Sequence, residues 1–146
     1  MIFSVKLAKG AKMPSKVHKS DAGFDLYAPE TFNNGNPRPI YGGESCIIDT
    51  GTAIKIPDGY CGLLVSKSGL NVKNGLTSTG LIDSGYTGNI VVKLYNQSNM
   101  VAYIESGQKI SQIVIFPIPG VELALVSDFE GESERGADGF GSSGKF

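Results

Sequence analysis

The last residues of the chain carry groups that hold phosphates in other proteins. Residues 139–145 read G-F-G-S-S-G-K, which fits the glycine and lysine spacing of a Walker A loop. That loop also needs a hydroxyl directly after the lysine and a helix behind it, but Phe146 stands where the hydroxyl belongs. Two interpretations remain: an idle Gly/Ser-rich tail, or a mobile lid. In the lid, glycine amides and Arg135 hold phosphate while Phe140 stacks on a base.

Two stretches at predicted strand ends carry further polar groups. Asp25 lies between Phe24 and Leu26 in a strand-like run, and it is either an outward-facing strand residue or a carboxylate that serves a site. Residues 65–70 read V-S-K-S-G-L, so that a strand ends in two hydroxyls, a lysine and a glycine. These groups suit phosphate binding at the start of a helix, and either serine also suits the N-cap of that helix.

Two more stretches place a reactive or polar side chain in a glycine-rich turn or in an apolar strand. Residues 80–88 read G-L-I-D-S-G-Y-T-G, a turn that displays Asp83 and Tyr86 among glycines. Turn formation alone explains the glycines, but a carboxylate and a ring beside an approachable backbone also suit a general base next to a nucleotide. Gln112 interrupts an apolar run at residues 110–116, against the usual preference of buried strands. Both stretches are therefore candidate site segments.

Short β segments must position all of these residues. Runs rich in Val, Ile, Tyr and Phe alternate with turn dipeptides such as Asp58-Gly59 and Asn74-Gly75, which predicts an all-β barrel or jelly roll. A helix of one or two turns is expected only at residues 68–73, and the apolar run 90–95 predicts a strand covered on both faces. The predicted strands are residues 2–7, 24–28, 45–48, 52–56, 60–65, 89–95, 101–105, 110–116 and 121–125.

Composition narrows the class of protein. The chain has 146 residues, 40% hydrophobic and 18% charged, which predicts one globular domain over residues 1–128 and a flexible glycine-rich tail over 129–146. A net charge of −1 without a basic block excludes a nucleic-acid backbone binder. No signal peptide and no membrane span is expected, so we predict a cytoplasmic protein. Cys46 and Cys61 are predicted to be buried free thiols, with a disulfide as the alternative.

Taken together and in this order, the five stretches resemble the five motifs of the trimeric dUTP pyrophosphatase (dUTPase) family. The family patterns are A-G-x-D-L, R-S-G-L, G-x-I-D-x-x-Y-x-G, G-x-R-I-A-Q and R-G-x-G-G-F-G-S-T-G. The matching segments run from Ala22 to Gly144, nearly the whole chain, and the third and fifth patterns are the specific ones.

The resemblance implies a jelly-roll subunit that forms a homotrimer, with each active site built from residues of all three copies. It implies hydrolysis of dUTP to dUMP and pyrophosphate, in which water attacks the α-phosphorus and Mg²⁺ is the cofactor. Asp83 activates the water, and Gln112 helps to position it. Asp25 touches Mg²⁺ through water, because the triphosphate supplies most of the ligands.

The other implied roles concern binding of dUTP. Tyr86 packs against the deoxyribose and excludes a 2′-hydroxyl, while a hairpin at about residues 77–80 reads uracil with its backbone. The tail closes over a site of a neighbouring subunit, where Phe140 covers the uracil and Arg135 holds the γ-phosphate. The implied substrate-binding residues are Ser66, Lys67, Ser68, Gly69, Thr77, Gly80, Ile82, Tyr86, Arg135, Phe140, Gly141, Ser142 and Ser143.

This chain departs from the family patterns at several positions. Lys67 and Lys109 replace arginines, so a point charge replaces a planar fork at each place. Ser111 replaces alanine, and Ala137-Asp138 stands where a second glycine is usual. Asp138 is expected to weaken phosphate binding by about 1 kcal/mol unless it points away.

Two other functions are weighed against this one. dCTP deaminase resembles the family in fold, but it requires a glutamate in the strand where this chain has Lys93, and it lacks the tail motif. A regulator that binds dUTP and a protein partner is the second alternative. Such proteins usually carry inserts, and no long insertion lies between Asn96 and Glu105.

Overall fold

The computed structural model of the protein describes residues 1–131 and 133–139. Strands dominate it, with one short α-helix, α1 (Ser68–Asn74), and one 3-10 turn, η1 (Phe32–Gly35). The strands are β1 (Ser4–Leu7), β2 (Phe24–Tyr27), β3 (Arg38–Ile40), β4 (Ser45–Asp49), β5 (Thr52–Lys55), β6 (Tyr60–Val65), β7 (Leu76–Thr77), β8 (Thr79–Ile82), β9 (Val91–Asn96), β10 (Ala102–Ile104) and β11 (Lys109–Pro117). Among the described residues, no helix is long and apolar enough to span a membrane.

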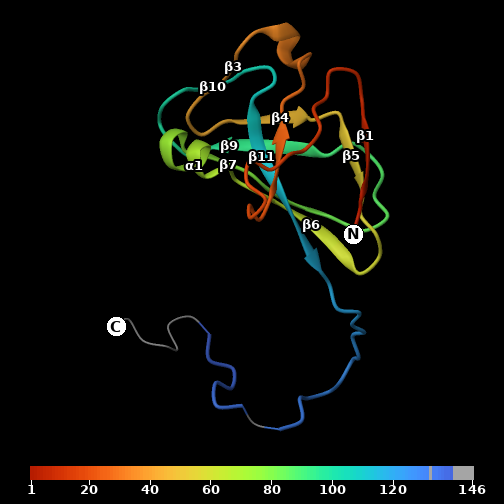
Figure 1. Cartoon of the computed structure of the whole chain (residues 1–146). Helices are drawn as coiled ribbons and strands as arrows, with labels where there is room; N and C mark the ends of the chain where they lie inside the picture. The colour runs from red at the N-terminus through yellow and green to blue at the C-terminus, as the bar shows by residue number, and fades with distance from the viewer. Residues whose placement is uncertain (132, 140–146) are drawn as a thin grey trace.

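The strands form a distorted jelly-roll barrel (Figure 1). The larger sheets have the orders β2-β11-β6-β8 and β4-β9-β7, and two-stranded sheets β1-β5 and β10-β3 complete the described part. All of these strand pairs are antiparallel. The core between the sheets is aliphatic, because alternate residues along each strand point inward. Its largest fully buried side chains include Leu26, Ile48, Ile56, Leu94, Ile104 and Ile113.

Eight of the nine predicted strands are confirmed within a few residues at each end, and α1 confirms the predicted helix. The prediction of a strand at 121–125 is wrong, because these residues follow the last strand and have no partner strand in the described chain. The last strand ends at Pro117, well before the predicted domain boundary at residue 128. Three strands were missed: β3, which contains Pro39, the two-residue β7, and β8, which contains Gly80. Their composition lacks the usual strand signal.

Two expectations about burial need correction. Burial alternates along β9, so Val92 and Leu94 are buried while Val91, Lys93 and Tyr95 are exposed, and the strand is covered on one face only. Cys46 and Cys61 are both free, as predicted, but Cys46 is only half-buried.

The start of α1 also differs from expectation. Lys67 is its N-cap residue, and neither neighbouring serine caps the helix through its side chain. At the other end, Gly75 adopts a left-handed backbone with φ of 67°, which ends the helix.

Candidate active site

Asp25 forms the centre of a cluster of opposite charges. Its Oδ1 lies 2.5 Å from Nζ of Lys67, which follows β6, and its Oδ2 lies 2.7 Å from Nζ of Lys109, the first residue of β11. The carboxylate is buried, so the prediction of an outward-facing residue is excluded. The two positions at which lysine replaces the family's arginine thus meet at one aspartate. We call Asp25, Lys67 and Lys109 the lysine–aspartate cluster.

The two ammonium groups govern the protonation of this carboxylate. Burial by itself raises the pKa of Asp25, but hydrogen bonds from Lys109 and Lys67 and their positive charges outweigh burial and lower that pKa below its ordinary 3.8. In turn, the hydrogen bond to Asp25 raises the pKa of Lys109 above its ordinary 10.5. At neutral pH the cluster therefore carries two positive charges and one negative charge, which leaves a net positive charge for an anionic ligand.

The lowered pKa of Asp25 predicts a pH-dependent contribution to stability. The ion pairs stabilise the fold fully above the unfolded pKa of 3.8, and this contribution is lost as the pH falls through the lower folded value. We expect Asp25→Asn to reduce the free energy of unfolding by about 2 kcal/mol at pH 7, because an amide cannot accept from both lysines. The difference from wild type should vanish on acidification, since the protonated wild-type carboxyl is then also neutral.

Urea unfolding of both proteins at pH 7 and at steps from pH 5 to pH 2 measures this difference. Asp58→Asn, at an exposed turn, serves as the control and should follow wild type throughout. A gap that persists unchanged to the lowest pH would show that the ion pairs are not its source.

The loop after β6 is joined to β11 next to this cluster. Nε2 of Gln112 donates to the carbonyl oxygen of Ser66 at 3.1 Å, and Gln112 pairs in register with Asp25. Gly23 makes room for this side chain, because a Cβ there would lie 2.9 Å from Oε1 of Gln112. The amide that interrupts an apolar strand is therefore held beside the lysine–aspartate cluster.

The hydroxyls of Ser66 and Ser68 differ in their surroundings. Oγ of Ser66 donates to the carbonyl oxygen of Ser78 at 3.2 Å and accepts from the backbone N–H of Ser78 at 2.9 Å. The hydroxyl of Ser66 therefore already has internal partners, whereas Ser68 and Gly69 are exposed at the start of α1. A Cβ on Gly69 would meet no atom within 4 Å, and the residue has no left-handed backbone. Packing within this chain therefore does not explain why residue 69 is a glycine.

The segment predicted as a uracil-reading hairpin has a different structure. Thr77 in β7 pairs with Tyr95 in β9, whereas Gly80 in β8 pairs with Leu64 in β6. Because β7 and β8 belong to different sheets, they do not form a hairpin, and the prediction of that turn geometry is wrong. Residues 76–82 instead cross from one sheet to the other, and we call them the crossover segment.

Asp83 and Tyr86 share a separate pocket of about 220 Å³. Oη of Tyr86 donates to the carbonyl oxygen of Asn89 at 3.0 Å, and Gly88 leaves space for the ring, because a Cβ there would lie 2.5 Å from the Tyr86 oxygen. Tyr86 is 45% exposed, so one side of its ring faces solvent. We call this the tyrosine pocket. It is lined by Leu81, Ile82, Asp83, Tyr86, Asn89 and Val91.

The lysine–aspartate cluster and the tyrosine pocket lie apart in one chain. Gln112 is opposite Val65, whereas Ile82, just before Asp83, is opposite Gly62. β11 and β8 also flank β6 on opposite sides. By strand geometry the backbones at Asp83 and Gln112 are then separated by roughly 16 Å. Two side chains so far apart cannot hold one water molecule between them.

Part of the predicted tail site is described. Nε of Arg135 donates to the carbonyl oxygen of Asp138 at 2.9 Å, within a turn that also bonds the Gly136 amide to Ser133. Arg135 therefore starts a compact turn rather than a helix. Phe140, Gly141, Ser142 and Ser143 lie outside the described residues.

Two polar features were missed by sequence reasoning. Lys109 was seen as a departure from the family pattern but was not assigned to the site, although its simultaneous change with Lys67 is a signal that the two share a partner. Ser78 had no signal of its own, yet it is buried and hydrogen-bonded to both Ser66 and Ser111.

An all-β jelly roll with a cationic loop and a carboxylate–tyrosine pocket suits an anionic ligand that carries a ring. Comparison with known families agrees with this class: the chain belongs to the dUTPase family, whose model matches residues 9–144.

Curated relatives match over almost their whole length. The deoxyuridine 5′-triphosphate nucleotidohydrolase of Clostridium tetani (strain Massachusetts / E88) is 39% identical over 147 residues, which cover 98% of this chain and 97% of the relative. The protein of the same name from Gloeobacter violaceus is 37% identical over 142 residues, covering 95% and 93%.

Solved structures match equally well. The dUTPase of Staphylococcus bacteriophage 80alpha, solved with dUpNHpp, has a TM-score of 0.87 at 37% identity and covers 98% of both chains. It is described as controlling transfer of virulence genes. A mutant dUTPase from phage phi11 of S. aureus, described for its coordination of a structural Mg(II) ion, has a TM-score of 0.78 at 31% identity; the match covers 90% of this chain and 100% of that one.

Proposed function

We propose that this protein hydrolyses dUTP to dUMP and pyrophosphate. The observation that carries the proposal, beside family membership, is the tyrosine pocket, which places an exposed carboxylate and a fixed ring together. The ring of Tyr86 packs against the deoxyribose and leaves no room for a 2′-hydroxyl. Asp83 accepts a proton from the water that attacks the α-phosphorus, a task that a carboxylate performs when water lies within hydrogen-bond reach.

The phosphates are bound at the other end of β6. Lys67 and Lys109 supply positive charge, and Ser68 supplies an exposed hydroxyl at the start of α1. Gly69 has no structural need to be glycine, and a missing side chain there lets phosphate oxygens approach the backbone. The crossover segment reads uracil through backbone groups of residues 77–80, with Ile82 nearby. Arg135 and the tail residues Phe140 and Gly141–Ser143 complete the site.

Magnesium fits this site only with the substrate as its main ligand. Within the described residues no group of three or more His, Cys, Asp or Glu side chains could hold a metal. Asp25 has a lysine on each oxygen, so this carboxylate would contact the metal only through a water molecule. When bound, Mg²⁺ would neutralise charge on the triphosphate, and sparse protein ligation suits an ion that takes most of its ligands from phosphate oxygens and water. The chain's own part is to hold the triphosphate with Lys67, Lys109 and Ser68.

A complete site requires more than one copy of the chain. In a single chain Asp83 lies far from Gln112 and from the lysine–aspartate cluster. Among the described residues, the tyrosine pocket therefore has no phosphate-binding group beside it in its own chain. A symmetric homotrimer that places the tyrosine pocket of one copy against the cluster of the next, and brings the tail from a third, supplies all parts three times. The same symmetry repeats one interface.

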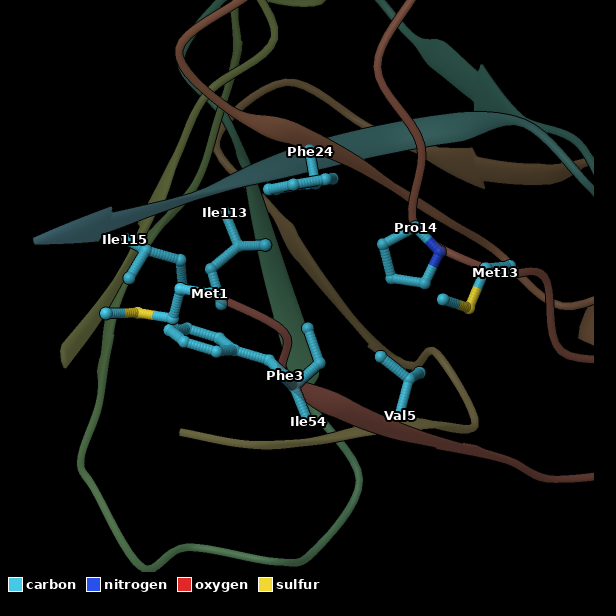
Figure 2. Close-up of a pocket in the computed structure, with 9 residues that line it drawn as sticks. All are labelled: Met1, Phe3, Val5, Met13, Pro14, Phe24, Ile54, Ile113 and Ile115. Carbon is cyan, nitrogen blue, oxygen red and sulfur yellow. The ribbon is translucent and has the colours of Figure 1, made fainter. Parts of the chain in front are cut away.

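An apolar groove on the barrel supports this assembly. Figure 2 shows its lining, in which Phe3 and Val5 of the N-terminal region face Ile113 and Ile115 of β11 across a cavity of about 320 Å³. β1, at its edge, pairs only with β5 in the described chain. Open apolar surface beside a free strand edge suits an apolar segment contributed by another molecule.

Residues 121–126 are the segment that we assign to this groove. They read V-E-L-A-L-V, with Val121, Leu123 and Leu125 alternating as on one face of a strand, and these three are 75%, 99% and 102% exposed. The segment leads away from its own barrel (Figure 1). We assign the groove of a neighbouring copy as the apolar cover of these side chains in the trimer.

Replacing Leu123 and Leu125 together by aspartate should dissociate the trimer. Each change removes about 2 kcal/mol of apolar burial per copy and brings a charge into the groove. Sedimentation equilibrium measures the mass, and dUTP hydrolysis should fall with it. Glu122→Gln, on the alternate face, is the control and should remain trimeric. A double variant that stays trimeric would place residues 121–126 outside the interface.

The test of the proposed reaction is pyrophosphate release from dUTP, dCTP, dTTP and UTP in parallel with Mg²⁺. Release from dUTP alone supports the proposal and the discrimination by Tyr86. Ammonia from dCTP would favour the deaminase. Against that function, Lys93 stands where the deaminase needs a glutamate, and it lies exposed on β9 with its Nζ 4.9 Å from the Tyr95 ring centroid. Hydrolysis of none of the four would refute the proposal.

A regulatory role remains the second candidate. One structural relative is described as controlling gene transfer, but β9 and β10 are joined here by a short connection, so no insert offers a partner surface at that place. Binding of dUTP without turnover would favour this role. A cytoplasmic location is expected because the substrate belongs to nucleotide metabolism.

A further inference from the structure

Two segments of this chain carry opposite charge. Residues 1–20 contain five lysines, at positions 6, 9, 12, 16 and 19, and no acidic residue. Residues 127–134 read S-D-F-E-G-E-S-E, with four acidic residues at alternate positions and no basic one. Because alternate residues of an extended chain point to the same side, these carboxylates form one acidic face when the segment is extended. We call residues 127–134 the acidic linker, since they join residues 121–126 to Arg135.

Most of these charges lack an ionic partner within the described part of one chain. Asp128, Glu130 and Glu134 are exposed and form no ion pair with any described residue, while Glu132 lies outside the described residues. Of the five lysines, only the one at position 12 lies near a described carboxylate, at 3.9 Å from Oε1 of Glu30. Solvent satisfies scattered charges, but two runs of opposite sign also suit each other.

Three of the lysines follow a sheet edge that separates the apolar groove from the lysine–aspartate cluster. β2 is the edge strand of its sheet, and Ser15 pairs with Asp25 on its outer side. On one face of this edge, Pro14 and Phe24 line the groove. Asp25 follows Phe24 along β2 and therefore faces the other side, where the cluster lies. We call residues 12–19 the lysine edge.

The lysines of this edge reach both of its faces. On the groove side, Nζ of Lys16 lies 4.6 Å from the centroid of the Phe24 ring. On the side of the lysine–aspartate cluster, Nζ of Lys12 lies 5.8 Å from the centroid of the Tyr27 ring. Lys19 is exposed further along the same segment. A chain that passes from the groove to the cluster around this edge therefore meets positive charge on both faces.

We propose that the acidic linker of one copy binds along the lysine edge of the neighbouring copy. This inference rests on the proposed function, in which residues 121–126 fill the neighbour's groove and the tail reaches a shared site. In Figure 2, Met13 and Pro14 lie at one end of the groove and Met1 and Ile115 at the other, so a chain that leaves past Pro14 arrives at the lysine edge. Eight extended residues span roughly 27 Å, whereas packed sheets lie about 10 Å apart, so the linker is long enough to pass around this edge.

This contact holds the tail close to the site before the nucleotide binds. Arg135 directly follows the acidic linker, so docking of the linker keeps Arg135 near the neighbour's lysine–aspartate cluster at a high effective concentration. Exposed ion pairs are individually weak, so the linker can also release its contact during turnover. The substrate of the contact is thus a second copy of this chain, recognised by charge.

Paired charge reversals test the contact. Asp128→Lys with Glu130→Lys reverses the linker, and Lys16→Glu with Lys19→Glu reverses the edge. Either pair alone should raise KM for dUTP about fivefold, the equivalent of two exposed ion pairs. All four changes together should return KM towards the wild-type value, because the charges are again opposite. An unchanged KM in the single pairs, or effects that add when the pairs are combined, would overturn the proposal.

Asp58→Lys with Glu44→Lys is the matched control. It makes the same change in net charge as the linker variant, at two exposed positions of the barrel, and should leave KM unchanged. An equal rise of KM in this control would assign the effect to net charge and overturn the contact. The linker lies outside every named strand, so its reversal should not change the unfolding temperature. If reversal of the edge lowers that temperature, the linker variant and cross-linking decide.

Carbodiimide cross-linking of the ligand-free protein supplies a readout that does not depend on activity. The reagent joins carboxylates to amines that touch them, so we expect links between the acidic linker and Lys12, Lys16 or Lys19. In trimers reassembled from nitrogen-15-labelled and unlabelled chains, these links should join labelled to unlabelled peptides, and high salt should suppress them. Links within single chains only, or no links, would overturn the proposal.

The same experiment separates this inference from the proposed reaction. If wild type shows links between copies and binds dUTP without hydrolysing it, the reaction fails alone, and the reversal ratios are measured as Kd. If it hydrolyses dUTP but shows no links between copies, the linker contact fails alone.

Discussion

Asp83→Asn is expected to lower kcat for dUTP by about 10³-fold, within the range that general-base catalysis supplies. Asparagine has nearly the shape of aspartate but cannot take the proton of the attacking water. The residue lies on an exposed turn in the tyrosine pocket, away from the lysine–aspartate cluster. Affinity for dUTP should therefore be largely kept.

Pyrophosphate release gives kcat, and calorimetric titration with dUTP gives Kd for the variant. Asp58→Asn changes another exposed turn aspartate in the same way and should retain full turnover. Turnover by Asp83→Asn at the wild-type rate would remove Asp83 from the mechanism. A loss of affinity equal to the loss of kcat would instead give it a role in binding.

Truncation after Phe129 should lower kcat/KM by about 10²- to 10³-fold, the sum of one aromatic stack and one arginine–phosphate contact. Every named strand ends by Pro117, so the barrel should keep its unfolding temperature. Residues 121–126 are retained, so the trimer should also persist. Activity and thermal unfolding are measured on the same preparation.

Deletion of Lys145 and Phe146 alone is the control for this truncation. A Walker A loop depends on its lysine, whereas the lid that we propose uses Arg135 and Phe140. We expect this short deletion to be nearly silent. If it abolishes activity, the phosphate grip is centred on Lys145; if the long truncation is fully active, the tail is idle.

The truncation after Phe129 and Asp83→Asn, when combined in one trimer, test whether active sites are shared between copies. In a mixed trimer, a truncated chain supplies Asp83 and an Asp83→Asn chain supplies the tail, so some sites contain both intact parts. The two variants are co-expressed with different affinity tags, so that mixed trimers can be purified. These trimers should show activity that neither variant has by itself. Mixed trimers without activity would mean that Asp83 and the tail act from the same chain.

The all-β class and most strand positions were determined by sequence, because alternation of side chains and turn residues are local properties. The candidate residues were also accessible in this way, since chemistry such as that of Asp83 and Tyr86 is carried by short motifs. α1 was predicted correctly for the same reason, with Gly75 at its end.

Only the tertiary structure decided which of these residues meet. Asp25 and Lys109 are far apart in sequence, and their ion pair depends on the register of β2 against β11. The crossover at Ser78 depends on two strands choosing different sheets, which a two-residue β7 does not encode locally. The separation of Asp83 from Gln112 likewise follows from strand order. Sequence therefore determined the elements and the reactive groups, while long-range pairing, which no local pattern records, decided that the candidate residues lie in two separate groups within one chain.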